Sequence, residues 1–286
     1  MIPEQLRLEL TNRLGSLKNI TPVGGGDINQ AARIEIDRAA YFVKWNLHPQ
    51  PRLFEAEARG LKLLAEAQAV RVPQVIATIN QPAALVLEWI EVGRHKPDSA
   101  EQLGRALAQQ HRSTSPTFGL DHDNYIGANP QSNQATESWI DFFRNQRLGV
   151  QAQLARERGH LTPDRFQRLD WIMTHLDKWI DSKSSLPSLL HGDLWSGNYL
   201  TDIQGQPVLI DPAVYYGDRE AEIAFTELFG GFGSRFYAAY DEAWPLRPGY
   251  ADRRDLYNLY HLLNHLNLFG EGYGGSVDTI LYRYSR

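Results

Sequence analysis

The chain has 286 residues, 42% hydrophobic and 22% charged, a composition typical of a globular protein with a sizeable core. Its net charge of −5 disfavours nucleic acid as a partner, because phosphate groups would repel it. No apolar run is long enough to cross a bilayer, the start lacks a secretory signal, and the absence of cysteine excludes disulfides and thiolate metal sites. We therefore expect a cytoplasmic protein that does not associate with membranes.

The first elements predict a helix, a glycine-rich loop and a strand. Apolar residues of segment 2–14 recur at helical spacing, and residues 32–36 alternate as in a strand. Between them, three consecutive glycines allow a tight turn whose backbone amides can approach phosphate oxygens. A plain hairpin is the alternative, because the full G-x-G-x-x-G spacing is missing. The candidate nucleotide-binding residues are Gly24, Gly25, Gly26, Asp27, Ile28 and Asn29.

Next come a lysine-bearing strand and a helix. Residues 41–45 place Lys44 among large apolar neighbours, where kinases of the V-A-I-K type hold the nucleotide phosphates. A solvent-facing lysine on an edge strand is the alternative. Segment 54–64 has helical periodicity, and Glu57 borders its apolar face. Glu57 is therefore the expected partner of Lys44, with Glu55 as the second choice.

Residues 75–79 and 84–87 predict two more strands, which lead into a connector at 88–90. We expect the backbone of Glu88 and Ile90 to pair with an adenine edge, whereas Trp89 fits either the connector or the core. Beyond residue 92 the pattern is helical, with a polar loop at 119–127. Predicted helices span residues 99–112, 137–148, 162–180, 220–229, 234–243 and 253–268.

Residues 191–198 have the pattern H-x-D-L-x-x-x-N, the catalytic loop of kinase-type phosphotransferases. In this pattern Asp193 accepts the proton of a substrate hydroxyl, and Asn198 binds Mg²⁺. A predicted hairpin of strands then leads to Asp211, which stands where kinases carry a second metal-binding aspartate. An ordinary turn would explain His-Gly-Asp alone, but not this ordered set of residues.

The segment after Asp211 is short. Only residues 214–219 separate Asp211-Pro-Ala from the next predicted helix, which leaves no room for a long activation segment. Gly192 also replaces the arginine that would bind an activation-loop phosphate. A peptide substrate needs that platform, so the sequence predicts a small-molecule acceptor and no control by activation-loop phosphorylation.

These motifs resemble the fructosamine kinase (ketosamine-3-kinase) family, within the protein-kinase-like fold shared with aminoglycoside and choline phosphotransferases. The resemblance implies an α+β bilobal fold, with an antiparallel-sheet N-terminal lobe at 1–90 and a mainly helical C-terminal lobe at 91–286. The blocks that carry it are 54–57, 123–127 with Gln131 and Asn133, 191–198, 211–220, 228–232 and 256–267.

The resemblance also implies a reaction. It is the ATP- and Mg²⁺-dependent phosphorylation of the 3-hydroxyl of fructosamines or ribulosamines, free or protein-bound, which serves protein deglycation. The family's roles carry over with Asp193 as base, Asn198 and Asp211 on magnesium, and Trp195 against the sugar. Lys44 contacts phosphate, and Glu57 anchors Lys44. Some relatives form a disulfide through a cysteine where this chain has Asp27, so that link between subunits is not available. Glu271 replaces a glycine favoured by relatives, with no evident consequence.

Two clusters leave alternatives open. His261 and His265 share one face of a predicted helix, where they fit either a metal site or a structural pair, and His265 is also a candidate substrate-binding residue. The acidic residues Asp218, Glu220 and Glu222 fit a solvated helix start. One of them, with Asp218 as the candidate, could instead meet the cationic amine of a ketosamine.

Two other functions compete with the ketosamine kinase. A kinase for an aminoglycoside or a choline-like alcohol would share the same catalytic core, but Trp195 and the last predicted helix disfavour it. A non-catalytic nucleotide-binding module is disfavoured because Lys44, Asp193, Asn198 and Asp211 are all in place. The preferred amine and the oligomeric state stay open.

Overall fold

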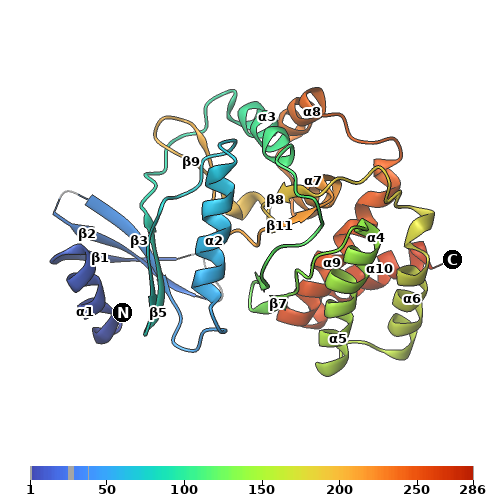
Figure 1. Cartoon of the computed structure of the whole chain (residues 1–286), viewed down its shortest axis with the longest axis horizontal. Coiled ribbons are helices and arrows are strands. Elements are labelled where there is room, and N and C mark those ends of the chain that lie inside the picture. The colour runs from blue at the N-terminus through green and yellow to red at the C-terminus, as the bar shows by residue number, and fades with distance from the viewer. Residues whose placement is uncertain (1, 25–28, 38, 286) are drawn as a thin grey trace.

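The computed structural model has a sheet at one end and helices at the other, with the first and last helices at opposite ends of the long axis (Figure 1). It describes residues 2–24, 29–37 and 39–285. We call the part up to the end of the sheet the sheet lobe, and the part from the helix after it onward the helical lobe. The predicted α+β bilobal fold is confirmed.

The sheet lobe is built on five antiparallel strands in the order β1-β2-β3-β5-β4. Period-two burial gives the sheet two apolar faces. Ala84 and Val86 pack with the helix α1, whereas Leu85 and Leu87 pack with the helix α2. The elements are α1 (Glu4–Leu14), β1 (Leu17–Val23), β2 (Gln30–Ile36), β3 (Ala39–Trp45), α2 (Leu53–Glu66), β4 (Val75–Asn80) and β5 (Ala83–Glu88).

Helix α2 lies between the sheet and the helical lobe (Figure 1). Its buried stripe of Phe54, Ala58, Leu61 and Leu64 follows the predicted helical spacing. On the same helix, a Cβ at Gly60 would lie 3.0 Å from the side chain of Val214. The helix that carries Glu57 therefore packs directly against the chain that follows Asp211.

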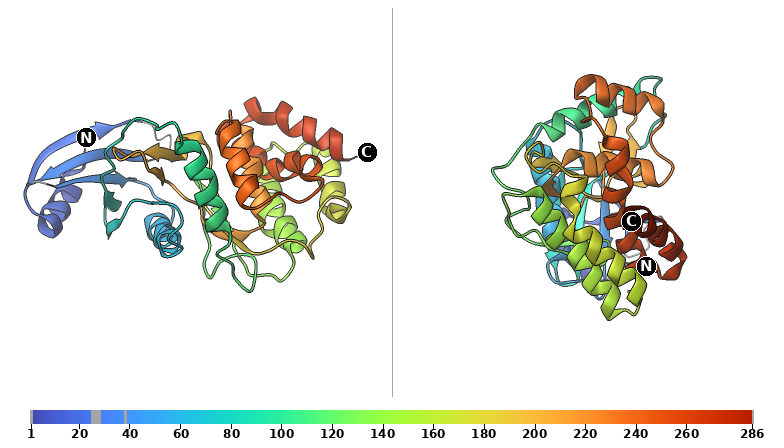
Figure 2. Two further views of the ribbon diagram at one scale, coloured as in Figure 1. Left: turned by 90° about the horizontal axis from the view of Figure 1, so that it is seen from above. Right: turned by 90° about the vertical axis from the view of Figure 1, so that its right-hand side faces the viewer.

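The helical lobe surrounds the long helix α9, whose inward face packs around Trp139 and other aromatic side chains. Figure 2 shows these helices gathered away from the sheet. The helices are α3 (Ser99–His111), α4 (Trp139–Phe142), the π-helical η1 (Phe143–Gly149), α5 (Val150–Glu157), α6 (Pro163–Thr174), η2 (Leu176–Lys178), α7 (Arg219–Leu228), α8 (Ser234–Ala243), α9 (Tyr250–Phe269), η4 (Glu271–Tyr273) and α10 (Gly274–Tyr284).

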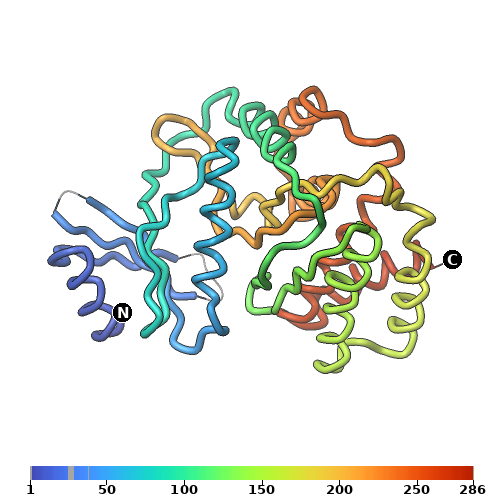
Figure 3. Tube along the Cα trace, viewed as in Figure 1, coloured from blue at the N-terminus to red at the C-terminus, as the bar shows by residue number. Residues whose placement is uncertain are grey.

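Three short antiparallel pairs frame the catalytic-loop segment. The predicted hairpin forms as β9 (Tyr199–Thr201) and β10 (Pro207–Leu209), after the single turn η3 (Ser196–Asn198). A second pair joins β8 (Ser188–Leu190) to β11 (Tyr215–Gly217), so the chain before His191 lies beside the chain after Asp211. The third pair is the hairpin of β6 (Asn124–Ile126) and β7 (Asn129–Gln131), within and just after the predicted polar loop. The tube in Figure 3 follows the chain from β5 into α3 and on to these segments.

Several predicted boundaries differ from the structure. The helix predicted to end at 148 continues through η1 to the end of α5, and the helix predicted for 162–180 breaks after Thr174. Strands β1, β6, β7, β8 and β11 and helix α10 were not predicted. Among the described residues, no helix is both long and apolar enough to span a membrane.

Candidate active site

Lys44 is a buried ammonium group at the centre of a cluster of charged side chains. Its Nζ lies 2.5 Å from Glu57 Oε1 and 2.8 Å from Asp211 Oδ1, so the predicted partner on α2 and the predicted metal-binding aspartate meet at one ammonium group. Glu55 pairs with Arg52 instead, 2.8 Å away, which excludes the second choice. Burial would lower the pKa of Lys44, but the two carboxylates outweigh it and raise this pKa above the usual range. Lys44 is therefore a cation at neutral pH.

Asp193 and Asn198 are held together at the catalytic loop. The Asn198 Nδ2 donates to Asp193 Oδ2 at 3.0 Å and to the Asp193 backbone oxygen at 2.8 Å. This orientation leaves the amide oxygen of Asn198 free to accept a cation. Burial and the nearby Asp211 carboxylate raise the pKa of Asp193 to about 7, near the working pH that suits a general base.

Asp211 combines an unusual backbone with an accessible carboxylate. Its φ of 53° lies in the left-handed region, and 49% of its side chain is exposed. The partial loss of water around Asp211 would raise its pKa, but the Lys44 ammonium group outweighs this effect and lowers the pKa. Oxygen atoms of Asp211 and Asn198 suit a hard cation such as Mg²⁺, which commonly takes one or two protein carboxylates and completes its shell with water and phosphate.

The catalytic loop is closely packed on the chain after Asp211. Gly192 has φ +83°, and a Cβ there would overlap the backbone oxygen of Ala213, so no other residue fits. His191 is fully buried, and burial lowers its pKa, so its ring is neutral. Its Nε2 donates to the Ile210 oxygen at 2.9 Å, and its Nδ1 accepts from the Asp193 amide at 3.3 Å. The histidine thus links the loop to the end of β10.

A buried glutamate binds the backbone of this loop, a role that sequence reasoning did not give it. Glu222 on α7 accepts hydrogen bonds from the backbone amides of His191 at 3.2 Å and Gly192 at 2.7 Å. The Nε2 of His111 lies 2.9 Å from the same carboxylate, and its Nδ1 lies 2.7 Å from the Tyr240 hydroxyl. In the sequence, His111 could have pointed to such a glutamate. It falls on the apolar face of its predicted helix and therefore needs a buried polar partner.

The acidic helix start is not solvated, which corrects the prediction. Asp218, Glu220 and Glu222 are all buried. Asp218 caps α7 by accepting from the Glu220 amide at 3.0 Å, and its other oxygen lies 2.5 Å from Arg247 and 2.6 Å from the Ser185 hydroxyl. The Asp218 side chain is 2% exposed and its carboxylate is occupied by these partners, which disfavours the predicted substrate contact.

Trp195 presents an aromatic face two residues after Asp193. Its side chain is 39% exposed, which is high for a tryptophan. A Cβ at Gly197 would overlap the indole ring, so the glycine leaves the space that the ring fills. The loop sequence therefore fixes an accessible apolar surface at a position two residues along the chain from the candidate base.

The two histidines of α9 are packing residues in the structure. His261 is buried and stacks on Phe225 with ring centroids 3.5 Å apart, and burial lowers its pKa well below the usual value. The Nδ1 of His265 donates to the His261 oxygen at 2.8 Å, while its ring packs against Phe229 and Tyr273. No group of three His, Cys, Asp or Glu side chains suits a metal in the described part of the chain, which leaves the zinc alternative without support. A substrate contact of His265 stays a prediction.

The structure describes the whole predicted connector but only part of the predicted glycine-rich loop. The Glu88 carboxylate pairs with Arg71 at 2.5 Å, Trp89 lies 5.3 Å from the Arg33 guanidinium, and Ile90 is buried. Asn29 Oδ1 accepts from Asn46 at 3.0 Å. Gly24 is described, but the remaining loop candidates lie outside the described residues: Gly25, Gly26, Asp27 and Ile28.

Glu271, whose consequence the sequence left open, joins the short helix η4 to α6. It accepts from both terminal nitrogens of Arg165 at 2.9 Å, and its Oε1 lies 3.2 Å from His160 Nδ1. Arg165 also donates to Asp278 on α10. The glutamate therefore stabilises the packing of the last helices, away from Asp193.

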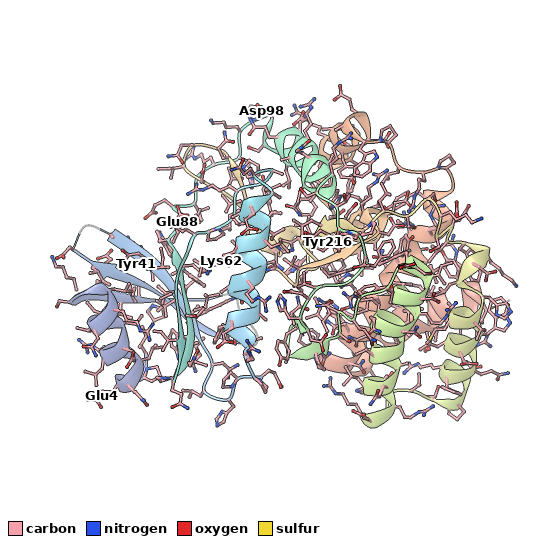
Figure 4. The ribbon with its side chains drawn as sticks, viewed as in Figure 1. Glu4, Tyr41, Lys62, Glu88, Asp98 and Tyr216 are labelled. Atoms are coloured by element: carbon pink, nitrogen blue, oxygen red, sulfur yellow. The ribbon has the colours of Figure 1, made fainter. Side chains whose placement is uncertain are left out.

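A groove of about 600 Å³ lies at a different place, between α2 and the helical lobe. Figure 4 shows Lys62 on α2 and Tyr216 on the facing segment, and both line this groove. Its lining includes none of Lys44, Asp193 and Asp211. The candidate active site is therefore defined by the charged side chains around Lys44, and this groove is separate from it.

The sequence matches the model of the fructosamine kinase family over residues 3–286. The chain is 46% identical to the probable ketoamine kinase of Synechocystis sp. over 262 residues, which cover 91% of this chain and 88% of the relative. It is 40% identical to the chloroplastic protein-ribulosamine 3-kinase of Arabidopsis thaliana over 275 residues, 94% of this chain and 83% of the relative.

A crystal structure from Thermobifida fusca, provisionally named a fructosamine-3-kinase, is similar over both lobes. Its TM-score is 0.89 at 31% identity, and the alignment covers 98% of each chain. The family-model match spans nearly the whole sequence, and the relatives are similar over most of their own length. The chain therefore belongs to the fructosamine kinase family.

Proposed function

We propose that this protein is an ATP-dependent kinase that phosphorylates the 3-hydroxyl of ketosamines such as fructosamines and ribulosamines. The names of its relatives, ketoamine kinase and protein-ribulosamine 3-kinase, support the acceptor class. The observation that carries the proposal is the cluster of Lys44, Asp193 and Asp211, within a chain that matches this family from end to end.

In the proposed reaction, Asp193 accepts the proton of the attacking hydroxyl. Asn198 occupies Oδ2 of this carboxylate, which leaves Oδ1 for the substrate. A raised pKa makes Asp193 a stronger base than an exposed aspartate, so it can take the proton as the oxygen–phosphorus bond forms. Trp195 supports the apolar side of the sugar and leaves its hydroxyls free for directional hydrogen bonds.

The nucleotide is proposed to bind between the glycine-rich loop at 24–29 and the connector at 88–90. Lys44 would hold its phosphates, with Glu57 fixing the ammonium group in place. Asn198 and Asp211 would supply oxygen ligands for magnesium, which would neutralise phosphate charge when bound. We propose the lobe boundary at residues 90 and 91, where the connector ends.

A panel of substrates distinguishes the proposed acceptor from the alternatives. Purified protein with ATP and Mg²⁺ is offered ribulosamine, fructosamine, an aminoglycoside and choline, each at the same concentration. We expect turnover of the two ketosamines, and ³¹P and ¹³C NMR of the product should place the phosphate on the 3-oxygen. Good turnover of choline or the aminoglycoside, with none for any ketosamine, would contradict the proposal.

A further inference from the structure

Arg147 is a fully buried arginine in the π-helical turn η1. Its guanidinium lies 3.8 Å from the ring centroid of Tyr215 and 4.5 Å from that of Phe142. No salt bridge joins it to a carboxylate of the described residues, although a buried charge without a counter-ion is costly. Since π-helical turns are frequently found at functional sites, this arginine calls for a functional explanation.

Arg147 can only donate hydrogen bonds, so it fixes the orientation of a row of buried amides. It donates to Asn133 Oδ1 at 2.9 Å, which turns Asn133 Nδ2 toward Asn124 Oδ1, also at 2.9 Å. The Nδ2 of Asn124 then donates to the backbone oxygen of Val214 at 2.8 Å. Reversing any one of these amides would place two donors or two acceptors face to face.

A second branch ends on the neighbouring carbonyl group. The Tyr260 hydroxyl donates to Gln131 Oε1 at 2.6 Å, which directs Gln131 Nε2 to the Ala213 oxygen at 3.0 Å. Gln131 Nε2 also donates to Asn124 Oδ1 at 2.8 Å, so the two branches are joined. The amides bind two consecutive carbonyl groups, two and three residues after Asp211.

The same short segment contacts the catalytic loop on its other side. The Ala213 amide donates to the His191 oxygen at 2.9 Å, and Gly192 packs against the Ala213 oxygen. The chain after Asp211 is therefore fixed between the catalytic loop and the β6–β7 hairpin. In a protein without a long activation segment, these contacts add to the Lys44 ion pair and the β8–β11 pairing in holding the aspartate in place.

We propose that Asn124 and Gln131 are positioning residues for phosphoryl transfer, oriented by Arg147 and Tyr260, and that they hold the Asp211 carboxylate in its working geometry. This inference rests on the proposed kinase function. Side chains that position a catalytic group affect the rate strongly, because a displacement of about 1 Å can cost ~100-fold.

Gln131→Glu tests the proposal with almost no change in side-chain size, since it replaces the donor to the Ala213 oxygen by another oxygen. We expect kcat to fall ~10-fold or more, with an unchanged KM for the ketosamine. Hydrogen–deuterium exchange of the amides in residues 211–217 should become faster. The exchange measurement needs neither substrate nor metal.

Asn129→Asp is the matched control. Asn129 is equally buried and lies in the same hairpin, but its Nδ2 donates to Asn264 Oδ1 at 2.8 Å, away from Ala213. We expect this variant to lose thermal stability while kcat and the exchange of residues 211–217 stay as in the wild type. Equal losses of kcat in the two variants, in proportion to their loss of stability, would overturn the proposal.

Tyr260→Phe keeps the test decisive if Gln131→Glu does not fold. It removes only the hydroxyl that orients Gln131, so we expect a smaller fall in kcat and a smaller rise in exchange. Wild-type values for both quantities would refute the positioning role. Failure of the wild-type protein to phosphorylate any ketosamine would instead refute the proposed function, and the exchange data would still decide the positioning of residues 211–217.

Discussion

At the residue scale, the candidate site depends on side chains whose neighbours fix their orientation. Asn198 occupies one oxygen of Asp193, Lys44 occupies one oxygen of Asp211, and Gly197 gives Trp195 its space. The sequence predicted Asp193, Asn198, Lys44 and Asp211 from motif spacing, and the resemblance to the family added Trp195. It could not predict that Asp218 is sequestered, because the partner Arg247 lies 29 residues further along the chain.

Asp193→Asn should abolish most of the phosphoryl transfer. The amide keeps the shape of the carboxylate but cannot accept the hydroxyl proton, so we expect kcat to fall by ~10²–10⁴-fold. Calorimetric titration with Mg–ADP should give a dissociation constant close to the wild-type value, because Asn198 and Asp211 are unchanged. A kcat near that of the wild type would remove Asp193 from the role of base.

Trp195→Ala should weaken the ketosamine more than the nucleotide. Loss of the aromatic face is expected to raise the KM for the ketosamine ~10-fold, with the KM for ATP unchanged. Initial rates with each substrate varied in turn provide the measurement. Trp195→Phe is the control and should recover most of the affinity, since it keeps an aromatic surface. An equal change in both KM values would show that Trp195 acts on the loop as a whole.

At the element scale, periodic segments were predicted well and short non-local ones were not. Helix α2 and strands β3 and β5 have clear apolar patterns, and the structure has them close to their predicted bounds. Strand β1 was missed because only Leu17, Ile20 and Val23 are partly buried in it, which gives no alternation. The pairing of β8 with β11 joins two three-residue strands, whose few residues carry no periodic signal.

Lys44 on β3 and Glu57 on α2 should behave as one unit. Each variant to alanine breaks the same ion pair, so Lys44→Ala and the double variant Lys44→Ala/Glu57→Ala are expected to lose similar activity. A double-mutant cycle in kcat/KM measures this coupling. Glu55→Ala is the control on the same helix and should stay near the wild type, because Glu55 pairs with Arg52. Fully additive losses would contradict the pairing.

Glu222→Gln should destabilise the protein in a pH-dependent way. Burial would raise the pKa of Glu222, but the hydrogen bonds from His111 and from the loop amides outweigh it and lower this pKa. A lowered pKa stabilises the fold above the ordinary glutamate pKa, and that stabilisation is lost as the pH falls through the lowered value. We expect a loss of ~3 kcal/mol in unfolding free energy at pH 7.

Thermal unfolding of wild type and Glu222→Gln between pH 3 and pH 8 provides the measurement. The difference between their Tm values should be largest near neutral pH and should shrink at the acidic end. Glu242→Gln is the matched control, because this glutamate is 69% exposed and its pair with Arg105 is solvated. A constant difference across the range would show that the charge of Glu222 is not what stabilises the loop.

At the scale of the whole molecule, long-range contacts connect the two lobes around the site. Arg71 pairs with Glu88 at the end of the sheet and with Asp202 in the β9–β10 hairpin, 131 residues away. Helix α2 contacts both the sheet and the segment after Asp211. The resemblance to the family implied the bilobal fold, but these contacts join residues too far apart in sequence for local patterns to pair them.

The short segment between Asp211 and α7 should make the enzyme tolerant of large acceptors. No long activation segment covers Trp195, so a ketosamine on a lysine side chain can enter while its protein stays outside. We expect comparable kcat/KM values for a free ketosamine and for the same sugar on a lysine-containing peptide. The unglycated peptide is the control and should not be phosphorylated. Turnover of the free compound alone would show that the site is closed to proteins.

The contact between Gly192 and the Ala213 oxygen also limits how this enzyme could evolve. Control by loop phosphorylation in protein kinases uses an arginine at this position. A single-nucleotide change can convert a glycine codon into an arginine codon. Here the first side-chain atom would already collide with the backbone, at a φ that disfavours every L-residue with a side chain. A lineage built on this loop would have to remodel residues 211–217 before it could acquire that switch. We therefore expect Gly192 to be conserved among related sequences more strictly than the catalytic chemistry alone requires.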